Sequence, residues 1–84
     1  MVWVTEAKYV EQYKIWLKFN DNLEATIDFE PILKDDTRKI ISDLLKTAIF
    51  RDFTVAIDTL TWSNSADFTP KYLYDLCRES KYVA

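Results

Sequence analysis

Two stretches near the N-terminus alternate apolar and polar residues, as half-buried β-strands do. The apolar sets are Tyr13, Ile15, Leu17 and Phe19 in the first stretch, and Leu23, Ala25, Ile27 and Phe29 in the second. A three-residue loop at 20–22 keeps both sets on one face, whereas a two-residue loop would oppose Phe19 to Glu24 and mix the faces. We therefore expect an antiparallel hairpin in which Phe19 faces Leu23 and Asn22 adopts the left-handed conformation.

The other face of this predicted hairpin is polar except for one ring. The same register sets Lys14 across from Asp28, Trp16 across from Thr26, and Lys18 across from Glu24. Two interpretations of Trp16 remain open. Either another segment covers the indole and the lysines extend around it, or Trp16, Lys14 and Lys18 form a partner-binding site, since Trp and basic residues are enriched at binding hot spots.

Three more strands are predicted. Residues 2–10 form one strand before this hairpin, and the turn between them falls at Glu11-Gln12. Residues 53–62 form a second hairpin. A tight Asp58-Thr59 turn would place Ile57 opposite Leu60 and Val55 opposite Trp62. Because tight turns favour Gly, we expect a less regular connection there.

Two helices complete the prediction. Pro31 ends the third strand, and a helix follows from about Asp36 to Ala48, or one turn further, with Asp36 or Thr37 as its N-cap. Its apolar positions are Ile40, Ile41, Leu44, Leu45 and Ala48. The last helix begins at Thr69-Pro70, because Thr caps helices and Pro suits their first position. Its inner stripe is Leu73, Leu76 and Cys77.

The predicted element order is βββαββα, which is the α+β class: a mostly antiparallel sheet of about five strands with two helices on one face. The chain of 84 residues forms a single domain, residues 1–84. Aromatic residues make up 15% of it, so large rings are expected in the core. A domain this small buries a limited share of its surface, which makes self-association plausible.

The composition lacks the residues on which most classes of enzyme depend. The sequence has no His and no Gly, so it lacks the usual neutral-pH base and the glycine-rich phosphate loops. Its one cysteine, Cys77, forms no disulfide within the chain and is expected to be a small buried side chain. The carboxylates considered for acid–base or metal chemistry have no specific spacing: Asp21, Glu24, Asp28, Asp58 and Asp67. We expect no catalytic residue, no cofactor and no metal.

The charge of the chain indicates which kinds of partner it can bind. The net charge is −3, and 11 basic residues are interleaved with 14 acidic ones, whereas nucleic-acid binders usually carry a basic face. A nucleic-acid-binding regulator remains an alternative, with these candidate residues: Lys14, Trp16, Lys18, Lys34, Arg38 and Lys39. No apolar run is long enough to cross a membrane, and the first residues do not resemble a signal peptide. We therefore expect a cytoplasmic protein.

The loop and helix at 62–74 resemble the signature of a small bacterial family, domain of unknown function 2442. The signature residues present here are Trp62, Asn64, Ala66, Asp67, Pro70, Leu73 and Tyr74. The resemblance extends to Val4–Ala7, residues 13–21 and Asp28. The chain departs from the family at Asn22 and Ser65, where members usually have Gly.

The resemblance implies a compact α+β domain, joined in some members to a helix-turn-helix domain. Other members stand alone, often encoded beside another small protein as in a toxin–antitoxin pair. Asn64 and Asp67 are expected to satisfy backbone groups of their loop, although a ligand-sensing pocket at this loop is a second alternative. The leading hypothesis is a non-enzymatic module that binds another small protein or self-associates, in an antitoxin-like role.

Overall fold

The computed structural model describes all 84 residues and shows an α+β fold with five antiparallel strands. Strands β1 (Val4–Glu11), β2 (Lys14–Phe19) and β3 (Glu24–Asp28) form one sheet in the order β1-β2-β3. Strands β4 (Phe53–Ala56) and β5 (Thr59–Trp62) form a separate two-stranded sheet beside β1. The single five-stranded sheet expected from the sequence is therefore divided into two.

The β2–β3 hairpin has the predicted register. Leu17 faces Ala25, Trp16 faces Thr26, and Phe19 donates its N–H to Leu23 O at 2.9 Å. Asn22 has a φ of 73°, which is the left-handed conformation that the sequence analysis assigned to it. Alternation of apolar residues is thus sufficient to set this pairing.

A short helix that the sequence analysis missed follows β3. Helix α1 (Glu30–Asp35) begins where Pro31 was expected only to end a strand. Pro31 occupies the first turn of α1, where its missing N–H costs no hydrogen bond. The carboxylate of Asp28 accepts the N–H of Glu30 at 3.0 Å, so the first N–H of α1 has a partner.

The helix predicted from Asp36 to Ala48 is wrong as one element. The region forms α2 (Lys39–Ser42), the 3₁₀ turn η1 (Asp43–Leu45) and α3 (Thr47–Phe50). The hydroxyl of Tyr13 donates to Leu45 O, the carbonyl that a continuous helix would offer to Ile49. The N–H of Ile49 bonds to Lys46 O instead. Asp36 caps no helix, because its carboxylate accepts the N–H and guanidinium of Arg38.

In the second hairpin the turn lies one residue earlier than predicted, and the pairing of the strands is therefore shifted by two residues. Phe53 pairs with Trp62 and Val55 with Leu60, so the two-residue turn is Ile57-Asp58. Both turn residues have positive φ, 51° and 67°, a tight turn rather than the less regular connection that was expected. Asp58 O accepts the N–H of Val4 at 2.8 Å, so the turn is docked on the start of β1.

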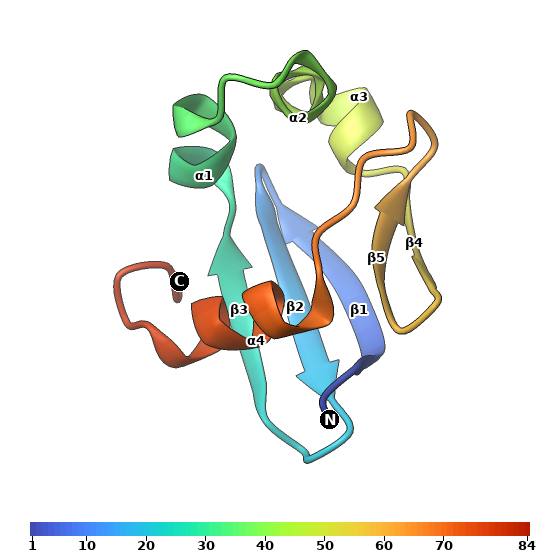
Figure 1. Cartoon of the computed structure of the whole chain (residues 1–84). Helices are drawn as coiled ribbons and strands as arrows, with labels where there is room; N and C mark the ends of the chain where they lie inside the picture. Colours follow the sequence, from blue (N-terminus) through green and yellow to red (C-terminus); the bar gives the residue numbers. More distant parts are fainter.

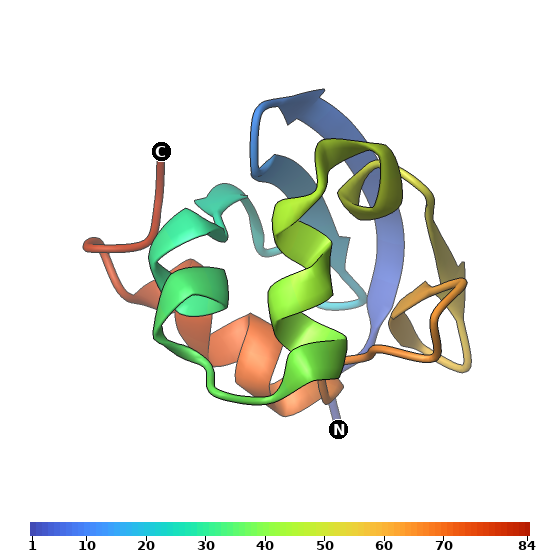
Figure 2. The same ribbon diagram turned by 90° about the horizontal axis from the view of Figure 1, so that it is seen from above.

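Helix α4 (Pro70–Arg78) forms as predicted and lies across the β1–β2–β3 sheet (Figure 1). The Thr69 hydroxyl accepts the N–H of Tyr72 at 3.2 Å, which confirms the cap, and Pro70 opens the helix. Seen from above, the helices gather on one side of this sheet (Figure 2). Leu73, Leu76 and Cys77 join the inner side chains of the strands in one core cluster of 18 residues.

The C-terminal segment extends the sheet beyond β3. Val83 forms a bridge with Ile27, and two further bonds join Asp28 N to Tyr82 O and Ala84 N to Thr26 O, both at 2.9 Å. The pairing covers much of the β3 edge, which would otherwise present unpaired backbone groups. It also fixes where Tyr82 lies.

Candidate interaction surface

The outer face of the β1–β2–β3 sheet, the one turned away from the helices, is defined by three rows of cross-strand neighbours. The rows are Glu6, Lys18 and Glu24; Lys8, Trp16 and Thr26; and Glu11, Lys14 and Asp28. None of these nine side chains belongs to the core cluster or to the apolar residues packed against it. Trp16 is the only apolar side chain among the nine and occupies the centre.

Trp16 is half-buried on this outer face and does not pack against the core cluster. The Lys8 ammonium lies 5.6 Å from the centroid of the indole, a cation–π distance. Lys8 was not among the predicted site residues, although it shares the alternation of β1 and could have been found by pairing that strand with β2. Lys8 is also the one lysine of the outer face with no carboxylate partner.

Lys14 and Lys18 flank Trp16 on β2, as predicted, but each is engaged within the sheet. Lys14 Nζ lies 3.9 Å from Glu11, and Lys18 Nζ lies 4.0 Å from Glu6. Both lysines thus pair with β1 rather than with the β3 carboxylates that face them. Such ion pairs at the surface contribute little to stability because water screens them.

The signature loop between β5 and α4 is built around Asn64. Its side-chain oxygen accepts the N–H of Ala66 at 3.0 Å, and its amide donates to Ile40 O at 3.0 Å. Trp62 N bonds to Ala66 O at 2.9 Å, and Ser65 adopts the left-handed conformation with a φ of 72°. Asn64 therefore holds the loop closed and ties it to α2, which is the backbone-satisfying role expected of it.

The other signature residues have different environments. Trp62 is 4% exposed and its indole N–H donates to Phe50 O at 2.8 Å, so it is a core ring. Pro70 starts α4. Asp67 is exposed and its side chain makes no hydrogen bond or ion pair, contrary to the expectation that it would satisfy backbone groups; only its backbone is engaged, in a bridge with Thr61. The structure thus leaves the carboxylate of Asp67 free.

Three titratable side chains outside the sheet face, Asp21, Tyr74 and Cys77, are held in structural contacts. The Tyr74 hydroxyl donates to Asp21 at 2.6 Å; this bond lowers the pKa of Asp21 and raises the pKa of Tyr74. Cys77 is 7% exposed, and burial raises the pKa of its thiol to about 11. A thiol with so high a pKa is protonated at neutral pH and is a poor nucleophile.

The basic residues considered for nucleic-acid binding are paired with acids. Besides Lys14 and Lys18, Lys34 lies 3.4 Å from Glu30 and Lys39 lies 3.1 Å from Asp43. Arg38 makes a two-point contact with Asp36, with distances of 2.8 and 3.1 Å. Lys14 and Lys18 lie on β2, Lys34 lies on α1, and Arg38 and Lys39 lie at the start of α2, so the five side chains belong to three parts of the fold.

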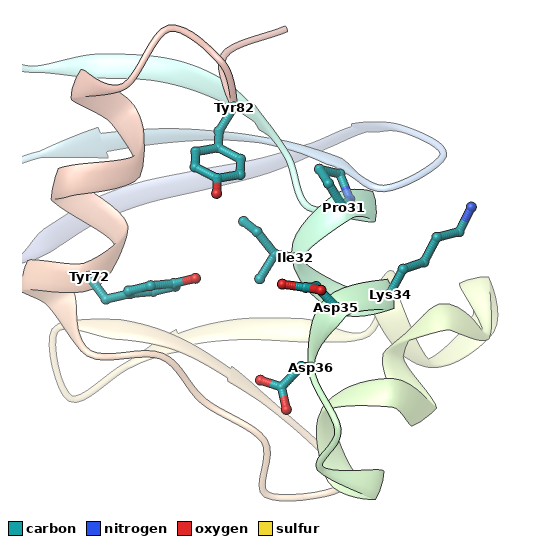
Figure 3. A pocket seen from close by; sticks show the side chains of 7 residues that line it. All are labelled: Pro31, Ile32, Lys34, Asp35, Asp36, Tyr72 and Tyr82. Carbon is teal, nitrogen blue, oxygen red and sulfur yellow. The ribbon is translucent and has the colours of Figure 1, made fainter.

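A cavity of about 520 Å³ was not foreseen from the sequence. It lies between α1, α4 and the C-terminal segment, and Tyr72 and Tyr82 form two of its walls (Figure 3). Only the tertiary fold brings these two tyrosines to one place, so no local pattern could have indicated the site. It lies on the helix-covered side of the sheet, away from Trp16.

Among the helices of this fold, none combines the length and the apolar character that spanning a bilayer demands.

Comparison with known proteins gives one match. No curated protein and no solved structure matches the chain. The family model described as "Protein of unknown function (DUF2442)" matches residues 4–79, which includes both hairpins and α4. The chain therefore belongs to the DUF2442 family.

Proposed function

We propose that this protein is a non-enzymatic interaction module that binds another protein through the outer face of the β1–β2–β3 sheet. The observation that carries the proposal is the position of Trp16, a large ring at the centre of a charged face and outside the core cluster. Trp is the residue type most enriched at binding hot spots, where a central ring is surrounded by polar contacts.

The charges around Trp16 define the partner. Lys8 has no carboxylate of its own chain and already lies beside the indole. A partner surface with an apolar side chain next to a carboxylate would cover the ring and pair Lys8 at the same time. The partner we expect is therefore a different protein with that combination, in an antitoxin-like pairing with a small neighbour.

Self-association through the same face is disfavoured by its charge pattern. The four corners of the face are all acidic: Glu6, Glu24, Glu11 and Asp28. Stacking two copies about a two-fold axis with the Trp16 rings at the centre brings corner against corner, and like charges in contact cost free energy.

Nucleic-acid binding is the alternative, and the same face counts against it. Its three lysines stand among four carboxylates, and the remaining basic candidates are ion-paired. Phosphate binding requires unpaired cations. A binding assay at increasing salt distinguishes the two, because a nucleic-acid complex would weaken steeply with salt, whereas a complex centred on an apolar ring would weaken slightly.

The test is affinity isolation of the tagged chain from its native cells, compared across three versions. We expect a stoichiometric partner with the wild type, its loss with Trp16→Ala, and its retention with Trp3→Ala. Trp3 is the matched control, because it is 39% exposed, lies before β1 and belongs to none of the three rows that define the outer face. A partner that persists in Trp16→Ala, or the absence of any stoichiometric partner, would contradict the proposal.

A further inference from the structure

We propose that the cavity between Tyr72 and Tyr82 is a binding site for an organic cation, a guanidinium or ammonium group carried on an aliphatic chain. The site lies on the opposite side of the sheet from Trp16 and is independent of the partner surface proposed above. Its volume is about 520 Å³, which is within the range of small-ligand sites.

The walls of the cavity come from three elements that the fold holds in place. Tyr72, on the first turn of α4, stacks on Phe68 with ring centroids 5.5 Å apart. Tyr82 is fixed by its backbone, since its carbonyl accepts the N–H of Asp28. Ile32, from α1, forms an apolar surface between the two rings (Figure 3). The cavity is therefore largely preformed.

The charge inside the cavity is negative. Asp35 directs its carboxylate toward the Tyr72 hydroxyl (Figure 3), and it has no hydrogen bond or ion pair within the protein. Asp36 is already neutralised by Arg38. The nearest lysine of the lining, Lys34, points away from the cavity in Figure 3 and pairs with Glu30 at 3.4 Å. One carboxylate is thus left without a counter-ion.

These groups select a particular kind of ligand. A cation pairs with Asp35, the two phenol rings present π faces that attract it, and Ile32 contacts a hydrocarbon stem. The Tyr82 ring already accepts one cation, because Lys81 Nζ lies 5.0 Å from its centroid. Lys81 is not part of the cavity lining, whereas the Tyr82 ring is. A planar guanidinium fits best, since it stacks on rings and bonds a carboxylate at two points.

Comparing a charged probe with its uncharged analogue isolates the contribution of the charge to binding. The backbone amides of the whole chain are followed by NMR while n-butylguanidinium or n-butylurea, which has nearly the same shape and no charge, is added. We expect saturable shifts for n-butylguanidinium in 30–36 and 70–82 only, and no saturable shift for n-butylurea. Equal shifts for both compounds, or none for either, would overturn the proposal.

Variants then assign the site. Asp35→Asn should weaken n-butylguanidinium binding about fivefold, because one exposed charge pair is lost. Asp52→Asn removes an exposed carboxylate far from the cavity and should leave binding unchanged, as should Trp16→Ala. Tyr82→Leu keeps the backbone bonds to β3 and removes the ring, so it should weaken binding while the fold is retained. Unchanged affinity in Asp35→Asn would refute the assignment.

A further binding measurement, with a peptide, distinguishes a cation carried by another protein from a free small molecule. An acetylated, amidated Ala-Ala-Arg-Ala-Ala peptide presents the same guanidinium from a polypeptide. Binding of the peptide as tight as that of n-butylguanidinium assigns the site to an arginine of another protein, and clearly weaker binding assigns it to a free small molecule. Either outcome supports a cation site, whereas binding of neither compound excludes one.

Discussion

The two faces of the β1–β2–β3 sheet are made by the same strands and differ in burial and in charge. On the inner face Ile15 and Leu17 are fully buried under the helices. On the outer face, one residue along the same strand, Trp16 is half-buried beside Lys8 and has no part in the core. The inner face accounts for stability, and the outer face is free to serve recognition. Substitutions on adjacent residues of β2 can therefore separate the two.

The largest loss of stability is expected for substitutions on the inner face. Leu17→Ala removes buried methyl groups and leaves a cavity, so we expect a loss of about 2–5 kcal/mol in the free energy of unfolding. Urea denaturation monitored by circular dichroism measures it. A loss below about 1 kcal/mol would show that Leu17 is not packed as described.

A smaller loss is expected at the edge of the same face. Tyr13→Phe deletes the hydroxyl that donates to Leu45 O and leaves that carbonyl unpaired, at a cost of about 1–2 kcal/mol. The loss should be accompanied by faster hydrogen exchange in α2 and α3, because this bond divides the helical segment there. Stability equal to the wild type would mean that the bond does not anchor the segment.

A gain in stability is expected for a substitution in the second hairpin. Ile57 is 92% exposed and has a φ of 51°, a conformation that β-branched residues disfavour. Ile57→Gly should raise the melting temperature, by an amount that corresponds to about 0.5–1 kcal/mol. Asn22→Gly, at a position already suited to its φ, is the control and should change stability less. A destabilised Ile57→Gly variant would show that the isoleucine side chain contributes packing.

On the outer face the expected change in stability is the smallest. Trp16→Thr keeps a residue that suits a strand and removes the ring and its contact with Lys8, so we expect less than about 1 kcal/mol. The same denaturation experiment as for Leu17→Ala measures it. A loss as large as that of Leu17→Ala would place Trp16 in the core and break the comparison.

Acid titration tests a surface contact apart from both faces. The Tyr74 hydroxyl lowers the pKa of Asp21 below its ordinary value of 3.8. This carboxylate therefore stabilises the fold above pH 3.8, and the stabilisation is lost as the pH falls through the lowered value. The decrease in stability on acidification should be smaller in Asp21→Asn than in the wild type. Identical pH profiles would show that Asp21 does not contribute.

Local patterns predicted the parts of the fold that depend on neighbours in the sequence. Alternation set the β2–β3 register and placed Trp16 outside, and Thr69-Pro70 marked the start of α4. Asn22 and Ser65, the two positions where the resemblance places Gly, both have positive φ. Each of these features follows from a few adjacent residues.

The failures involve distant contacts. The single helix predicted at 36–48 did not allow for Tyr13, whose hydroxyl takes a carbonyl of that segment. The turn at Ile57-Asp58 conflicts with residue preference, and it is accompanied by the contact of Phe53 with Trp62 and the bond from Val4 to Asp58. The cavity at Tyr72 and Tyr82 likewise requires α4 and the C-terminal segment to be in place. Chain pattern alone carries no information about such contacts.

The central claim is that Trp16 recognises a partner and does not hold the fold together. Isolation of the tagged chain from its native cells, as wild type, Trp16→Ala and Trp3→Ala, tests it most directly when each variant is first shown to be folded. The account predicts one stoichiometric partner with the wild type and with Trp3→Ala, and none with folded Trp16→Ala. Recovery of the same partner with all three versions would contradict it.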